Sequence, residues 1–66
     1  MITLHVEGMT CNHCKAAVTN ALEELAGVTA VEVHLQEGTV DVQFDEAKVT
    51  VEALKEAIEE QGYDVK

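Results

Sequence analysis

Short runs in which apolar and polar residues alternate predict the strands of this chain. Near the N-terminus Ile2, Leu4 and Val6 alternate with polar residues, a period of two that is typical of a strand with one buried face. The alternation returns twice in the middle of the chain, where the polar turn Gln36-Glu37-Gly38 separates the two runs and predicts a hairpin. The expected strands cover residues 2–7, 31–35, 40–44 and 63–65.

A first helix is predicted over residues 14–26, after the first strand. Its larger apolar residues recur at helical spacing, and Gly27 supplies the left-handed position that commonly ends a helix. The residues expected on its buried face are Val18, Ala21, Leu22 and Leu25.

A second helix is predicted to begin after Thr50, which is a suitable N-cap, with Glu52 in the first turn and Gly62 as the stop. Its expected buried stripe consists of Val51, Leu54, Ala57 and Ile58. Elsewhere in the chain, Leu25, Val33 and Phe44 are expected in the core with Ile58.

The order strand, helix, strand therefore occurs twice, joined by a hairpin. Two right-handed crossovers of this kind predict an α+β, ferredoxin-like βαββαβ fold, with a four-stranded antiparallel sheet and both helices on one face. No proline-rich or low-complexity stretch interrupts the pattern, so residues 1–66 are expected to form a single domain. A chain of this size buries only about 60% of its extended surface and has no room for a deep substrate cleft, which favours a binding module over an enzyme.

The net charge and the N-terminal sequence limit the kinds of partner and the location that the chain can have. Thirteen acidic residues against four basic ones give a net charge of −9, which argues against binding to nucleic acid or to an anionic membrane surface. No apolar run approaches the roughly 20 residues of a membrane span, so membrane insertion is not expected. The N-terminus lacks the basic region of a secretion signal, which favours a cytoplasmic location. If the charge steers docking, the partner surface should be basic.

The two cysteines of the chain, Cys11 and Cys14, lie three positions apart between the first strand and the first helix. In a reducing compartment this spacing indicates metal or redox chemistry. Cys14 is expected in the first turn of the helix, where the unpaired N–H groups and the helix dipole favour a thiolate. The positive charge of Lys15 also favours the thiolate. Glu7 is the nearest carboxylate in the sequence, and its negative charge disfavours the thiolate.

Two thiolates without a dependable further ligand suit Cu(I), which accepts low coordination, better than Zn(II), which takes four ligands in structural sites. Zinc would have to recruit His5, His13 or His34. In the predicted sheet order the third strand separates His5 from His34, and both point to the polar face, so neither should reach the cysteines.

The segment Gly8-Met9-Thr10-Cys11-Asn12-His13-Cys14 resembles the G-M-x-C-x-x-C signature of heavy-metal-associated domains, and the whole chain resembles the small bacterial copper chaperones of that family. The resemblance implies that Cys11 and Cys14 bind Cu(I), that Met9 packs beneath the loop and that Tyr63 lies close to the metal. Zinc and cadmium relatives often carry an acidic residue where Thr10 stands, and mercury-binding relatives carry secretion signals, so the resemblance favours copper.

The same resemblance implies cytoplasmic delivery of copper to the metal-binding domains of a copper-transporting P-type ATPase. A copper-responsive repressor is a second implied partner, and a copper-bridged homodimer is a further implied assembly.

The supporting residues each admit a plainer role. Packing is the expected role of Met9, although its thioether is also a soft ligand. His13 either hydrogen-bonds to the metal-bound sulfurs or is an exposed residue at the helix start, and both interpretations remain open. Tyr63 shields the thiolates, starts the last strand with its ring on the core, or does both. Thr10 is a candidate helix cap as well as a loop residue.

Two other functions compete with a chaperone. A thiol oxidoreductase also places a C-x-x-C pair at a helix start, but this chain has no proline and no tryptophan, so it lacks the cis-proline of thioredoxin-like enzymes, and no enzyme is expected. The second alternative is a regulatory metal-binding domain of a larger transporter, which the sequence distinguishes poorly from a free chaperone. Met1 directly before the first strand and Lys66 directly after the last favour a free-standing protein.

Overall fold

A computed structural model describes residues 2–9 and 12–66 of the chain. Six elements follow one another in the order strand, helix, strand, strand, helix, strand, and the sheet is antiparallel with the order β2-β3-β1-β4. This is the ferredoxin-like arrangement predicted from the sequence. The elements are β1 (Ile2–Glu7), α1 (Asn12–Glu23), β2 (Val28–His34), β3 (Thr39–Phe44), α2 (Val51–Glu60) and β4 (Asp64–Val65).

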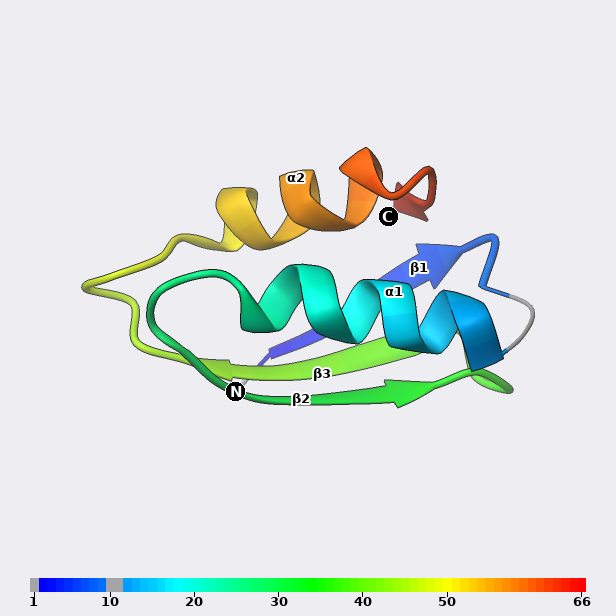
Figure 1. Ribbon diagram of the computed structural model, residues 1–66, viewed down its shortest axis with the longest axis horizontal. Helices are drawn as coiled ribbons and strands as arrows, with labels where there is room; N and C mark the ends of the chain where they lie inside the picture. Colours follow the sequence, from blue (N-terminus) through cyan, green and yellow to red (C-terminus); the bar gives the residue numbers. More distant parts are fainter. Residues whose placement is uncertain (1, 10–11) are drawn as a thin grey trace.

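Both helices cover the same face of the sheet, which confirms the predicted layers (Figure 1). The core lies between these layers and is built from the inward positions of the strands and from one stripe of each helix. Leu25 and Phe44, expected in the core, are half-buried and pack against it. The core residues are Leu4, Val6, Met9, Val18, Leu22, Val33, Val40, Val42, Val49, Leu54 and Ile58. Within the described residues, neither helix combines the length and the apolar character that crossing a membrane requires.

The first helix differs from its predicted bounds. α1 begins at Asn12 and ends at Glu23, earlier than the predicted end at residue 26. The N–H of Leu25 donates to the carbonyl of Leu22, three residues back, at 3.1 Å. This spacing is one residue shorter than in an α-helix, so the last turn is tighter, and the chain then turns towards β2. Helical spacing predicted Leu25 inside the helix because its side chain still packs on the core from this turn.

The predicted bounds of three strands were also wrong, and β3 begins at Thr39, one residue earlier than predicted. Leu35 lies in the turn between β2 and β3 instead of the strand, and β4 begins at Asp64 instead of Tyr63. β2 starts earlier than predicted, at Val28, and a bulge interrupts its pairing with β3 between Val28 and Ala30. The bulge shifts the side-chain alternation at the start of this edge strand, which is why the period of two was recognised only further along.

The second helix begins as predicted, because the Thr50 hydroxyl accepts a hydrogen bond from the N–H of Ala53 at 3.1 Å. The prediction that Val51 is buried was wrong, since its side chain is 37% exposed. Val51 is the first helical residue, and helical side chains tilt towards the N-terminal end of the helix, where no preceding turn covers them. Val49, which precedes the cap and is 7% exposed, packs against the core instead.

On the helix-free face, a polar network joins the three longest strands. The Thr3 hydroxyl of β1 donates to Asp41 Oδ1 of β3 at 2.6 Å, and His34 Nε2 of β2 lies 3.1 Å from Asp41 Oδ2. The hydrogen bond from Thr3, followed by the one from His34, holds the pKa of Asp41 below its ordinary value. The ionised carboxylate is therefore the form that the folded sheet favours.

We expect the variant Asp41→Asn to be less stable than the parent chain at neutral pH, and the difference to vanish in acid. A carboxyl whose pKa is lowered by folding adds stability above its unfolded pKa of about 3.9, and this stability is lost as the pH falls through the folded value. Urea denaturation between pH 7 and pH 2.5 measures the effect, with Glu56→Gln, at an exposed carboxylate of α2, as the control. A difference that stays constant down to pH 2.5 would contradict this account.

Candidate metal centre

The segment that leaves β1 turns at Gly8. The φ angle of Gly8 is +98°, a left-handed conformation that side chains other than glycine rarely adopt. The ring of Tyr63 lies against this turn, since a Cβ added at Gly8 would stand 3.3 Å from Tyr63 Cδ1. Tyr63 is half-buried and packs against the core as well. The last turn before β4 and the first turn after β1 are thus in contact.

Met9 follows this turn and is 6% exposed, within the core cluster. The packing interpretation of Met9 expects such burial. A buried side chain at this point ties the start of the cysteine loop to the core, so the loop begins from a fixed position.

Cys14 is the third residue of α1 and therefore lies in its first turn, as predicted. Its side chain is half-buried and packs against the core cluster. The first turn of α1 contains no acidic residue, so no carboxylate of that turn competes with a thiolate for the positive end of the helix dipole. Both neighbours of Cys14, His13 and Lys15, are exposed. The geometry leaves both interpretations of His13 open.

Two residues of the predicted site, Thr10 and Cys11, lie outside the described residues. Cys11 directly precedes Asn12, the first residue of α1, in the sequence. Its role as the second sulfur ligand, like the role of Thr10 as a cap, stays a prediction.

The carboxylate nearest to the loop in sequence, Glu7, forms an ion pair with Lys66. Both side chains are more than half exposed, at 54% and 70%, so the pair contributes little to stability. It does bring a positive charge to the end of β1. The opposing effect predicted for Glu7 on a thiolate in the loop is therefore reduced.

The other histidines lie on the sheet. His5 of β1 and His34 of β2 both pair with Thr39, so β3 runs between them as the predicted sheet order requires. His34 contacts Asp41 and, at 3.6 Å, Glu32. Among residues 2–9 and 12–66, no three His, Cys, Asp or Glu side chains are arranged to hold a metal ion.

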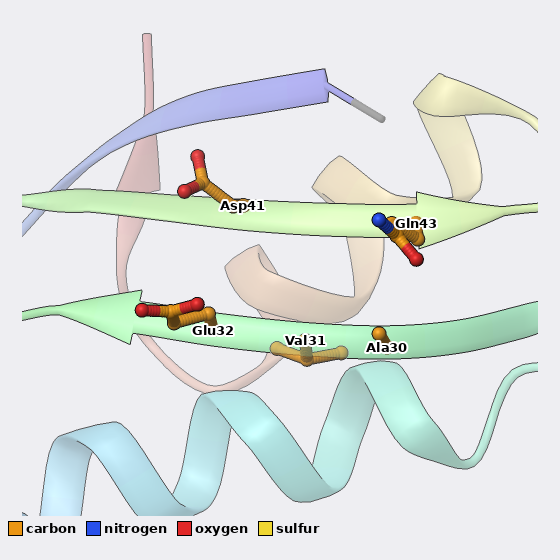
Figure 2. Close-up of a pocket in the computed structure, with 5 residues that line it drawn as sticks. All are labelled: Ala30, Val31, Glu32, Asp41 and Gln43. Atoms are coloured by element: carbon orange, nitrogen blue, oxygen red, sulfur yellow. The ribbon is translucent and has the colours of Figure 1, made fainter.

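A shallow hollow of about 140 Å³ lies over β2 and β3 (Figure 2). The carboxylates of Glu32 and Asp41 and the amide of Gln43 line it, and Ala30 and Val31 complete it. None of the residues predicted for the metal site belongs to this hollow. The hollow is therefore separate from the candidate metal site at the cysteines.

Sequence reasoning missed two contacts at the site. The contact of Tyr63 with Gly8 was not predicted, because the two residues are far apart in the chain; the family resemblance implied only that Tyr63 lies close to the metal. The ion pair of Lys66 with Glu7 was not predicted either: Glu7 faces Asp64 across β1 and β4, so Lys66, two residues further along, is its diagonal neighbour.

A family model, described as the heavy-metal-associated domain, matches residues 3–64 of the chain. The copper chaperone CopZ of Staphylococcus aureus strain RF122 is 58% identical over 62 residues, which cover 94% of this chain and 91% of that protein.

Solved structures agree with this match. A CopZ metallochaperone superimposes with a TM-score of 0.97 at 54% identity, covering 98% of this chain and 97% of the other. The N-terminal domain of a potential copper-translocating P-type ATPase from Bacillus subtilis, in the Cu(I)-loaded state, has a TM-score of 0.92 at 33% identity and covers 97% of this chain and 80% of that domain.

Proposed function

The chain belongs to the heavy-metal-associated domain family, and from that premise we propose that it is a copper chaperone that binds Cu(I) through Cys11 and Cys14 and transfers it to a copper-transporting P-type ATPase. The observation that carries the proposal is the identity of 58% over 62 residues with a relative named a copper chaperone. Residues 1–66 act as one metal-binding domain in the cytoplasm, and no enzymatic reaction is involved.

The choice of Cu(I) is supported by the donor set. Thiolates are soft ligands that select Cu(I), and two of them satisfy this ion, whereas a structural zinc site takes four ligands. The position of Cys14 at the positive end of α1 favours its ionised form. A related ATPase domain is described in its Cu(I)-loaded state, which supports the same oxidation state for the cargo here.

Transfer proceeds by exchange of sulfur ligands. A cysteine of the partner domain loses its proton and forms a bond to the bound Cu(I), and one chain sulfur then leaves the metal and takes up a proton. The second cysteine of the partner then replaces the second chain sulfur in the same way. Copper stays Cu(I) throughout, so no electron donor or acceptor is needed, and the half-buried position of Cys14 leaves part of its surface open to a partner.

The partner is proposed to be a metal-binding domain of the ATPase. The Bacillus subtilis domain shares the fold of this chain and is described in the Cu(I)-loaded state, which supports such a domain as the acceptor of the copper. Transfer to a copper-responsive repressor and a copper-bridged homodimer are further proposals on the same chemistry.

A second candidate function is a regulatory metal-binding domain within a transporter. The likeness to the N-terminal domain of a potential copper-translocating P-type ATPase supports it, since a domain of the same fold occurs within that transporter. The length of the natural open reading frame distinguishes the two.

Copper transfer tests the proposal directly. The reduced chain, loaded anaerobically with one equivalent of Cu(I), is mixed with the metal-free Bacillus subtilis ATPase domain and separated by anion exchange, which the net charge of −9 makes practical. We expect copper to redistribute between the two proteins within minutes. Copper that stays with the chain, or a reduced chain that prefers Zn(II) with more than two protein ligands, would overturn the proposal.

A further inference from the structure

The end of β1 is hydrogen-bonded to the turn between β2 and β3. Regular pairing of β1 with β3 ends at His5 and Thr39. The next residue of β1, Val6, donates its N–H to the carbonyl of Gly38, at 2.8 Å. Gly38 is the last residue of the β2–β3 turn, so this turn extends the sheet to the residue that lies two positions before Gly8.

Gly38 is also in close contact with the same peptide. Its φ angle is +69°, and a Cβ added there would stand 3.3 Å from the carbonyl oxygen of Val6. The N–H of Gly38 donates back to the carbonyls of His34 and Leu35, at 2.9 and 3.3 Å, so the turn itself is held in place. A side chain at this position would therefore have to displace either the turn or Val6.

Displacement of Val6 has a defined consequence for the cysteine loop, the segment from Gly8 to Cys14. The Val6 side chain is 4% exposed, and on its other side β1 pairs with β4, where Val6 faces Val65. Cys14 is positioned independently, by α1, whose Val18 and Leu22 are fully buried in the core. A shift at Val6 thus moves the start of the loop relative to Cys14.

We propose that the β2–β3 turn, through the contacts of Gly38 with Val6, is a positioning element that sets the start of the cysteine loop relative to Cys14. The inference rests on the proposed function for its metal readout. Groups that orient metal ligands typically change metal affinity by about 10–100-fold when they are altered. Gly38 acts through the backbone of Val6, so we expect the lower end of that range.

The test compares three variants of the full chain. In Gly38→Ala, the Cβ presses on the Val6 carbonyl, and we expect Cu(I) affinity to fall about 10-fold in an anaerobic competition with a Cu(I) chelator. Replacement of Gly38 by D-alanine, accessible by chemical synthesis, suits the positive φ angle and places the methyl group on the other side of the Cα, out of the position that meets the Val6 carbonyl. This variant should retain an affinity within about twofold of the parent chain.

Gly27→Ala controls for lost stability. Gly27 lies in the α1–β2 connection, at the opposite end of the molecule from the end of β1 and the start of α1 (Figure 1). A Cβ there would stand 2.7 Å from Lys48 Cβ, so this variant is expected to lose at least as much stability as Gly38→Ala. Affinities are measured at a temperature at which circular dichroism shows all variants folded, and Gly27→Ala should keep the parent affinity.

A second readout needs no metal. In the apo protein, Gly38→Ala should shift the amide resonances of Glu7, Gly8 and Met9, and Gly27→Ala should leave them in place. Unchanged Cu(I) affinity and unchanged loop resonances in folded Gly38→Ala would overturn the inference, as would a D-alanine variant as weak as Gly38→Ala. If the parent chain fails to bind Cu(I), the proposed function falls, and the amide shifts alone then decide whether the turn positions the loop.

Discussion

Replacing Cys14 by serine should lower the affinity of the reduced chain for Cu(I) by more than about 100-fold, beyond the range seen for groups that only orient a ligand. The substitution exchanges a soft sulfur for a hard oxygen that stays protonated at neutral pH, and it leaves a single thiolate for the ion. Serine is close to cysteine in size, and Cys14 is only half-buried in the first turn of α1, so the fold should persist.

The measurement is an anaerobic competition titration that also records proton release. Thiolates are the metal-binding form of cysteine, so Cu(I) binding should displace thiol protons, and the serine variant should release fewer of them. Cys11→Ser is expected to behave in the same way. Met9→Leu is the matched control, because Met9 is buried in the core and leucine preserves its packing. Parent-like affinity in either serine variant would end the two-thiolate assignment, and a large loss in Met9→Leu would make the thioether a third ligand.

Elements governed by local chemistry were predictable from the sequence. The alternation in β1, the turn around Gly38 and the cap at Thr50 each depend on residues a few positions apart, and each stands in the structure near its predicted place. The ferredoxin-like order followed from these elements and from the handedness of their connections. The position of Cys14 in the first turn of a helix followed in the same way.

What the sequence left open depends on contacts between distant segments. Val49 lies in the core and Val51 does not, and this depends on how the segment that enters α2 packs against the rest of the fold, which periodicity within the helix does not contain. The contact of Tyr63 with Gly8 and that of Gly38 with Val6 join residues at the two ends and the middle of the chain. Pattern analysis finds the glycines at these places and does not identify their neighbours.

Leu54→Ala should bring the metal-free chain close to unfolding. The Leu54 side chain of α2 is fully buried in the core, and leucine-to-alanine changes in such positions cost about 2–5 kcal/mol. At about 0.05–0.15 kcal/mol per residue, a domain of this size has only about 3–10 kcal/mol of stability in total. Urea denaturation of the reduced apo protein, followed by circular dichroism, should show a large fall in the unfolding midpoint.

Val51→Ala supplies the matched control within the same helix. The helical pattern predicts Val51 and Leu54 on one buried stripe, whereas the structure exposes Val51 and buries Leu54. Truncation at an exposed helix position changes stability by only about 0.5 kcal/mol or less, and alanine has the better helix propensity. The two variants should therefore differ by several-fold in their loss of stability. Equal losses of stability would contradict the observed packing and would indicate that Val51 is buried, as the helical pattern predicts.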